Sequence, residues 1–128
     1  MPGIRGVYET VLYSNDVPAL VAFYGDLVGL RSIDPPDQHS AAFRLADGGV
    51  LLVFDPQRSA APDRLVPSHG ATGEGHVAFR VDGLDELAAG LRDRGIEVER
   101  EIAWDGGRSV YFRDPARNSV EFVEGEIW

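Results

Sequence analysis

The amino-acid sequence contains an internal repeat, and this repeat limits the folds that the chain can adopt. Four pairs of positions are related by an almost constant spacing: Glu9 and His76, Leu12 and Phe79, Leu20 and Leu87, and, with two more residues of offset, Leu52 and Glu121. Such a repeat indicates two structural units that are built alike. In each half a helical pattern lies between strand patterns, in the order βαβββ. The sequence therefore predicts an α+β fold of two tandem βαβββ modules that pair into a curved mixed-sheet cleft.

Local patterns place the same elements in both halves. Apolar residues at helical spacing predict a first helix from a cap at Asn15 or Asp16 to Gly29. A second helix opens at Asp82 or Gly83. Strands are expected at residues 7–14, 30–33, 41–45 and 50–54, and again at 76–81, 97–102, 108–113 and 119–124. The length suits a single domain over residues 1–128, with modules at roughly 5–55 and 75–124 and a Pro- and Gly-rich linker at roughly 56–74.

Composition argues against several classes of partner. The formal net charge is -9, whereas nucleic acids and anionic membranes are bound by clusters of positive charge, so we expect neither as a partner. No apolar stretch approaches the roughly 20 residues that span a bilayer, and the N-terminus lacks a signal-peptide pattern, which favours a cytoplasmic protein. Cysteine is absent, which excludes thiolate chemistry and cysteine-bound metals. The basic residues are all Arg, a bias that points to a GC-rich bacterial genome.

One carboxylate, Glu121, lies in the middle of a predicted strand. The stretch Ser109–Glu124 reads as strand, turn and strand, with Val120 and Phe122 on the core face and Glu121 on the opposite face. Glu is disfavoured at the centre of a strand, and an unpaired buried charge is unfavourable. We therefore expect either solvent or a cation to meet this face.

If the two modules are equivalent, four repeat-related positions face the cleft: Glu9, Leu52, His76 and Glu121. One imidazole and two carboxylates suit a divalent ion such as Mn, Fe, Ni, Zn or Mg. Three protein ligands also leave positions open for water or substrate, as in catalytic sites. Glu9, His76 and Glu121 are therefore the predicted metal ligands, and no metal at all is the alternative.

The remaining cleft positions suggest an organic ligand with an apolar end and an oxygen-rich end. The predicted substrate-binding residues are Tyr13, Leu52, Phe54, Arg80, Trp104, Ser109, Tyr111 and Arg113. Trp104 is expected either to cover the pocket or to pack on the edge of a hairpin. Arg113 is expected to contact substrate or to pair with Asp114 or Glu121. We expect His69, in a glycine-rich stretch, to be solvent-exposed or at the substrate rim.

Three stretches carry a family resemblance: D-V-P-A-L-V-A-F-Y-G-D-L-V-G-L at Asp16 to Leu30, G-H-V-A-F-R-V at Gly75 to Val81, and Y-F-R-D-P-A-R-N-S-V-E-F at Tyr111 to Phe122. They resemble the vicinal oxygen chelate superfamily of glyoxalase I, extradiol dioxygenases, fosfomycin-resistance transferases and bleomycin-resistance proteins. The resemblance implies that superfamily's fold and, as in its metal-dependent members, ligands at Glu9, His76 and Glu121. Two positions depart from it. Glyoxalase I has a fourth acidic ligand where this chain has Leu52, and the dioxygenase and fosfomycin branches usually have His at the position of Glu9.

Two functions remain open. In the first, an enzyme holds a divalent metal that chelates adjacent oxygens of a small oxygen-rich organic substrate, and Glu9 or Glu121 moves a proton. Lyases, isomerases and dioxygenases share this first step. In the second, a metal-free dimer sequesters an antibiotic or another small molecule, as the bleomycin-resistance branch does. A homodimer is expected in both cases, because related modules commonly complete their clefts by pairing and Ile127-Trp128 is an apolar end that needs cover.

Overall fold

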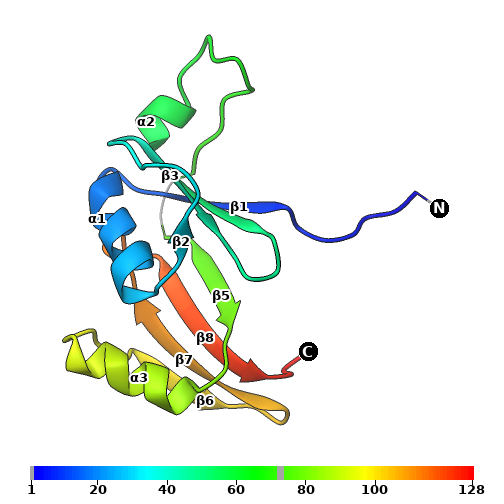
Figure 1. Ribbon diagram of the computed structural model, residues 1–128, viewed down its shortest axis with the longest axis vertical. Coiled ribbons are helices and arrows are strands. Elements are labelled where there is room, and N and C mark those ends of the chain that lie inside the picture. Colours follow the sequence, from blue (N-terminus) through cyan, green and yellow to red (C-terminus); the bar gives the residue numbers. More distant parts are fainter. Residues whose placement is uncertain (1, 72–73) are drawn as a thin grey trace. The chain divides into compact units, whose positions relative to one another are not determined.

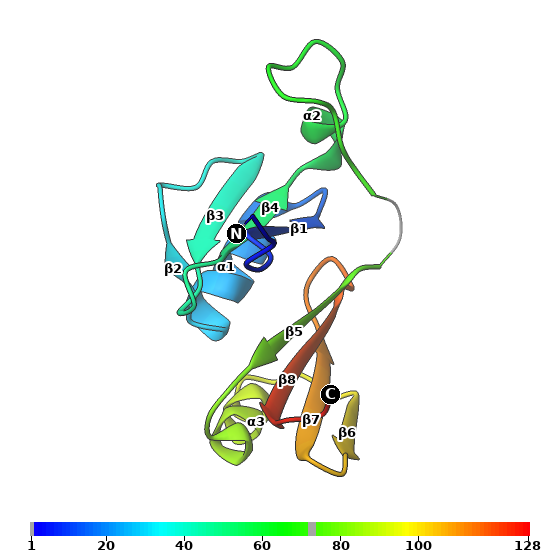
Figure 2. The same cartoon turned by 90° about the vertical axis from the view of Figure 1, so that its right-hand side faces the viewer.

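The structure, a computed structural model, describes residues 2–71 and 74–128. The chain divides into two compact units, Met1–Thr72 and Gly73–Trp128, called the first and the second unit below. Each unit contains one four-stranded mixed sheet and a helix that packs on one face of that sheet (Figure 1, Figure 2). The expected α+β fold of two tandem βαβββ modules is therefore confirmed.

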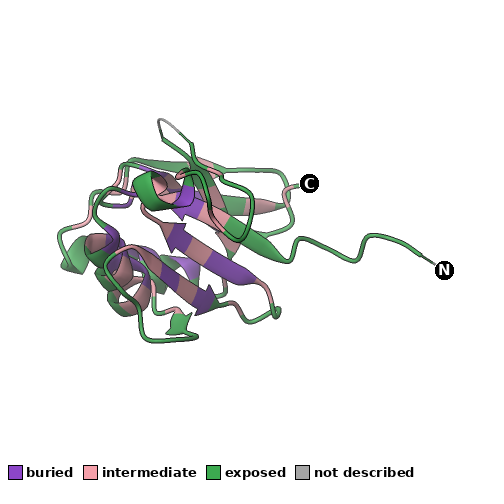
Figure 3. Ribbon diagram, turned by 90° about the horizontal axis from the view of Figure 1, so that it is seen from above, coloured by how far each residue is buried: buried purple, intermediate pink, exposed green. Residues whose placement is uncertain are grey.

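In the first unit the strand order is β1-β4-β3-β2. Strand β1 (Glu9–Tyr13) runs parallel to β4 (Val50–Phe54), and β4, β3 (Ser40–Arg44) and β2 (Arg31–Ser32) pair antiparallel. Helix α1 (Val17–Ala22) packs against β3 and β4. Buried positions recur along the strands, as the colouring of Figure 3 shows. The buried core between the helix and the sheet includes Leu12, Val17, Leu20, Phe43, Leu51 and Val53.

The first helix differs from the predicted one in its second half. One regular helix was expected to reach Gly29, but α1 continues as a π-helix, η1 (Phe23–Leu27). The N–H of Val28 donates to the carbonyl oxygen of Phe23, five residues back, at 3.0 Å. Both Phe23 and its neighbour Tyr24 are buried. Gly29 adopts a φ of 84°, which other residues rarely adopt, and ends the helix as predicted.

In the second unit the strand order is β5-β8-β7-β6. Strand β5 (His76–Arg80) runs parallel to β8 (Ser119–Gly125), and β8, β7 (Gly107–Arg113) and β6 (Arg100–Ala103) pair antiparallel. Helix α3 (Leu84–Asp93) packs against β7 and β8. Its apolar side and the helix-facing side of the sheet form the core, which includes Leu84, Ala88, Leu91, Val110, Phe112, Val120 and Phe122.

The segment predicted as a linker contains a short helix, α2 (Pro56–Ser59). Asp55 caps it, because its carboxylate accepts a hydrogen bond from the backbone N–H of Gln57 at 2.9 Å. This cap-and-proline start is a local signal that the sequence prediction missed. No helix in the described part of the chain has the length and apolarity needed to cross a bilayer.

The N-terminus of α3 is stabilised by a side chain from the other end of the unit. Gly83, at the cap position, has no side chain to accept the free N–H groups of the first turn. The Glu124 carboxylate takes that role, accepting from the N–H of Gly83 at 2.8 Å and of Leu84 at 3.0 Å. The Leu84 hydrogen bond and the Arg108 guanidinium hold the pKa of Glu124 below its usual value.

This cap predicts a pH-dependent contribution to stability. A carboxyl whose pKa is lowered by folding stabilises the native state above its ordinary pKa, and this contribution is lost as pH falls through the lowered value. Glu124→Gln should therefore unfold at a lower denaturant concentration than the wild type near neutral pH, and the difference should shrink by about pH 3. Glu126→Gln is the matched control, since Glu126 forms an exposed ion pair with Arg80. Equal midpoints for Glu124→Gln and the wild type at neutral pH would contradict the capping role.

Candidate functional site

The parallel pairing of β5 with β8 brings two predicted metal ligands together. Ala78 lies opposite Glu121 in the register, and His76 lies opposite Ser119, so the side chains of His76 and Glu121 stand on the same face of the sheet. His76 Nε2 lies 3.3 Å from Glu121 Oε1. The pair stands on the face opposite the core residues Val120 and Phe122. The third predicted ligand, Glu9, is an exposed residue at the start of β1 in the first unit.

Glu121 is buried, although the sequence placed it on an unpacked face. Its exposed fraction is 5%. The Ser109 hydroxyl donates to Glu121 Oε2 at 2.5 Å, and the indole N–H of Trp104 donates to the same hydroxyl at 2.9 Å. The carboxylate therefore has one oxygen bound by a hydroxyl and the other beside an imidazole, which offsets the penalty of burying its charge.

The hydrogen bond that His76 makes through Nδ1 determines which ring nitrogen carries the proton when the ring is neutral. His76 Nδ1 lies 3.1 Å from the backbone carbonyl oxygen of Ser119. A carbonyl oxygen can only accept, so Nδ1 carries the proton and Nε2 of the neutral ring presents a lone pair. That lone pair faces a carboxylate oxygen, which is also an acceptor. Two acceptors at this distance attract each other only when a cation or an added proton lies between them.

The geometry of this pair fits a metal ion. Bonds of about 2.0–2.2 Å to nitrogen and oxygen, at ordinary angles between ligands, put the two ligand atoms roughly 3.0–3.4 Å apart. The observed separation of 3.3 Å lies in that range. Fixing the outer nitrogen on a carbonyl is also the usual arrangement of a metal-binding histidine. Within the described residues, no group of three or more His, Asp or Glu side chains gathers around one point, so the second unit by itself supplies two ligands.

Tyr111 stands beside this pair. Its ring stacks on that of His76, with centroids 6.3 Å apart and an interplanar angle of 20°. Its register partner on β8 is Glu121. Burial, and then the negative charge of Glu121, raise the pKa of Tyr111. The phenol therefore keeps its proton at neutral pH and can donate it to an oxygen atom bound nearby.

The two predicted substrate-binding arginines already have partners inside the second unit. Arg80 pairs with Glu126 at 2.9 Å. Arg113 pairs with Glu99 at 2.8 Å and with Glu74 at 3.2 Å. A ligand that binds either guanidinium has to compete with these ion pairs.

The first unit presents a less polar face. Its parallel strands put Glu9, Val11 and Tyr13 in register with Val50, Leu52 and Phe54 of β4. Val11, Tyr13, Leu52 and Phe54 are all half-buried. Leu52 stands beside Val11, so the position equivalent to Glu121 in the repeat holds a leucine among apolar neighbours. This face has one acid at one end and aromatic side chains at the other.

His69 belongs to this aromatic end, although its sequence position in a glycine-rich stretch gave no sign of it. Its Nδ1 lies 2.6 Å from the Tyr13 hydroxyl, and its ring centroid is 5.4 Å from that of Phe54. The N–H of His69 donates to the carbonyl oxygen of Ser59 in α2 at 2.9 Å, which holds the segment in place. His69 also borders a hollow of about 540 Å³, together with Pro56, Ala60, Ser68, Gly70 and Ala71.

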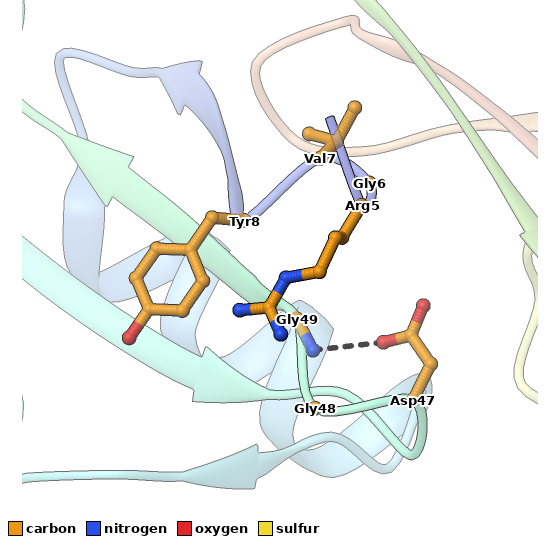
Figure 4. Close-up of a pocket in the computed structure, with 7 residues that line it drawn as sticks. All are labelled: Arg5, Gly6, Val7, Tyr8, Asp47, Gly48 and Gly49. Atoms are coloured by element: carbon orange, nitrogen blue, oxygen red, sulfur yellow. Dashed lines mark hydrogen bonds between the residues drawn. The ribbon is translucent and has the colours of Figure 1, made fainter. Parts of the chain in front are cut away.

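A second hollow lies elsewhere on the first unit and contains none of the predicted site residues (Figure 4). Its volume is about 400 Å³, and it lies between the N-terminal segment and the turn that joins β3 to β4. The Asp47 carboxylate points into that turn, where it accepts from the N–H of Gly49 at 2.8 Å. The Asp47 carboxylate therefore stabilises the turn.

Comparisons with known proteins agree with the two-module fold. The matched family is the Glyoxalase/Bleomycin resistance protein/Dioxygenase superfamily, over residues 6–122. The crystal structure of a lactoylglutathione lyase from Agrobacterium tumefaciens has a TM-score of 0.91 and is 39% identical, with 98% of each chain covered. The lactoylglutathione lyase of Haemophilus influenzae is 27% identical over 94% of this chain and 93% of its own.

A dioxygenase is similar as well. Biphenyl-2,3-diol 1,2-dioxygenase 3 of Rhodococcus globerulus is 29% identical over 87% of this chain, which spans only 58% of the dioxygenase. The family match and the similar lyase structure together identify the family. The chain belongs to the Glyoxalase/Bleomycin resistance protein/Dioxygenase superfamily, and the resemblance noted in the sequence is confirmed.

The hydrogen bonds of the histidines predict their tautomers. At about pH 8, ¹⁵N NMR of the chelator-treated protein should show His76 with a proton on Nδ1, because the Ser119 carbonyl oxygen can only accept. His69 should carry its proton on Nε2, because the Tyr13 phenol, 2.6 Å from His69 Nδ1, is a stronger proton donor than a neutral imidazole N–H. Tyr13→Phe should change the His69 signals and leave the His76 tautomer as it is. A neutral His76 with its proton on Nε2 would contradict the proposed arrangement.

Proposed function

We propose that this protein is a divalent-metal-dependent enzyme that binds a small, oxygen-rich organic substrate through two adjacent oxygens. Glu9, His76 and Glu121 are the proposed metal ligands. The observation that carries the proposal is the pair in the second unit, where His76 Nε2 lies 3.3 Å from an oxygen of the buried Glu121 carboxylate and His76 Nδ1 lies 3.1 Å from a backbone carbonyl oxygen. Such a pair is unfavourable unless positive charge lies between its members, and a metal-binding function explains why the fold maintains it.

The protein's own groups suit chemistry at an acidic C–H or O–H next to a bound oxygen. A divalent ion, when bound, would withdraw electron density from the substrate oxygens. Tyr111, protonated at neutral pH, is placed to donate a hydrogen bond to a substrate oxygen near His76. Glu9 is exposed at the start of β1, and this carboxylate or Glu121 is proposed to accept and return the substrate proton. Leu52 and Phe54 supply an apolar surface for the remainder of the substrate.

The relatives indicate which substrates to test first. Two of them carry the name lactoylglutathione lyase, so thiol adducts of 1,2-dicarbonyls are the first candidates, followed by catechols because of the dioxygenase relative. Leucine at position 52 removes one acid from the ligand set that the glyoxalase I resemblance implies. The proposed reaction class is therefore a lyase, isomerase or dioxygenase that works with three protein ligands.

A metal-free binding protein is the second candidate, and one observation favours it. Tyr13, Phe54 and His69 form an aromatic cluster on the open sheet face of the first unit, beside apolar Val11 and Leu52. Such a surface suits an amphipathic or aromatic ligand and requires no catalytic group. Binding of an antibiotic by the chelator-treated protein, with no effect of added metal, would favour this function over the enzyme.

We also propose that the protein is a bacterial, cytoplasmic homodimer. Both termini present large exposed apolar side chains, with exposed fractions of 98% for Ile4 and 108% for Trp128. Association of two copies would cover these side chains. The similar proteins described above come from bacteria.

Elemental analysis and metal titration test the proposed site directly. Untagged protein should bind about one divalent ion per site, with thermal stability that is lost on chelation and restored by Mn, Fe, Ni or Zn. Changes outside a ligand shell weaken metal binding by about 10- to 100-fold, so the loss of a ligand in His76→Ala or Glu121→Gln should weaken it by more than that. Glu9→Gln should also weaken binding.

A matched control separates a ligand effect from a general effect of losing a histidine. His39 pairs with Asp55 in the first unit at 3.3 Å and is not a proposed ligand, so His39→Ala should keep wild-type affinity. Circular dichroism should show that each variant remains folded. Wild-type metal content in both His76→Ala and Glu121→Gln would overturn the proposed centre.

A further inference from the structure

Trp104, Ser109 and Glu121 form a chain of hydrogen bonds whose direction is fixed. An indole N–H can only donate, and a carboxylate can only accept. The Ser109 hydroxyl lies between them, accepting from Trp104 Nε1 at 2.9 Å and donating to Glu121 Oε2 at 2.5 Å. Since the Trp104 N–H uses one lone pair of the hydroxyl, the hydroxyl hydrogen is directed at Glu121.

Ser109 and Glu121 are so deeply buried that water cannot easily replace the hydrogen bond between them. Ser109 is 1% exposed and Glu121 is 5% exposed. If the hydroxyl is removed, Glu121 Oε2 loses the Ser109 donor in a buried place, and the orientation of the carboxylate toward His76 is less well held. The hydroxyl therefore fixes the orientation in which Oε1, the other oxygen, faces His76 Nε2.

The backbone of the turn between β6 and β7 holds Trp104 next to Ser109. Trp104 and Gly107 close the turn between β6 and β7, where the N–H of Trp104 donates to the carbonyl oxygen of Gly107 at 2.8 Å. A Cβ atom on Gly106 would collide with the carbonyl oxygen of Glu126, and one on Gly107 with that of Glu124. The two glycines thus allow the turn to lie directly against the end of β8. The sequence W-D-G-G therefore delivers the indole to a fixed place beside Ser109.

We infer that Trp104 and Ser109 are positioning residues for the metal-binding carboxylate Glu121, with Trp104 acting through the Ser109 hydroxyl. The inference rests on the proposed metal centre, and it assigns to these two residues a role in binding affinity that is separate from substrate contact. Hydrogen bonds to a ligating carboxylate hold it in the geometry that the ion requires, so the ion does not have to order it.

The test is the affinity of the chelator-treated protein for Mn, Ni or Zn, measured by competition with a chelating dye. Ser109→Ala should bind about 10- to 100-fold more weakly than the wild type. Ser109→Thr, which keeps a hydroxyl, should recover most of that loss. Trp104→Phe, which keeps an aromatic ring but lacks the N–H, should lose less than Ser109→Ala. Because Trp104 acts through Ser109, adding Trp104→Phe to Ser109→Ala should cause little further loss.

Two variants of matched chemistry serve as controls. Trp128→Phe alters an exposed tryptophan at the chain end. Ser59→Ala removes a buried hydroxyl that has no hydrogen-bond partner among the described residues. Both should keep wild-type affinity. A metal-independent readout is the indole N–H signal of Trp104 in NMR, which should shift in Ser109→Ala and in Glu121→Gln but not in Ser59→Ala.

The outcomes distinguish this inference from the proposed function. Metal binding by the wild type together with unchanged affinity in Ser109→Ala would overturn the positioning role and leave the metal centre in place. Additive losses from Trp104→Phe and Ser109→Ala would overturn the route through Ser109. No metal binding by the wild type would overturn the proposed function and, with it, any role of these residues in holding an ion, even if the indole signal confirmed the hydrogen bonds.

Discussion

Each half of this protein depends on the parallel pairing of its first strand with its last. Residues in register on neighbouring parallel strands point to the same face, so β5 and β8 present His76 and Glu121 side by side. The same pairing of β1 with β4 aligns Glu9 with Val50 and Val11 with Leu52. In each unit a helix covers one face of the sheet, which leaves the other face to carry functional groups. The chain order βαβββ thus produces, in each unit, one sheet face that this helix does not cover.

On that surface in the second unit, the main physical problem is the burial of Glu121. An isolated buried carboxylate would be neutralised or expelled, because transfer of a charge from water costs far more free energy than a folded domain can offset at one residue. The structure surrounds it with a hydroxyl donor, an imidazole and a protonated phenol. The same three groups would also hold Glu121 in the orientation in which it could bind a cation. The neighbours of Glu121 therefore stabilise the folded chain and, at the same time, orient this carboxylate for the proposed metal ion.

The sequence predicted what depends on local periodicity and on the repeat. Strand β4 begins and ends at the predicted residues, Val50 and Phe54, because strong alternation is bounded there by turn signals. Strand β6 was expected to begin at Glu97, three residues before it does, and to end at Ile102, one residue before it does, since its register depends on the turn closed by Trp104 and Gly107. The burial of Glu121 and the contact between His69 and Tyr13 were not predictable, because each depends on side chains distant in sequence.

The two halves have kept one backbone pattern while their chemistry has diverged. The repeat places Leu52 and Glu121 at equivalent positions, one among apolar and aromatic side chains and the other in a hydrogen-bond network. An acid at position 52 would stand beside Val11, on a sheet face whose apolar and aromatic side chains supply no positive charge to pair with it. Leucine at position 52 needs no such partner, whereas Glu121 has the Ser109 hydroxyl and the His76 ring beside it. The divergence therefore gives the first unit an apolar and aromatic sheet face and the second unit a buried carboxylate that is held by hydrogen bonds.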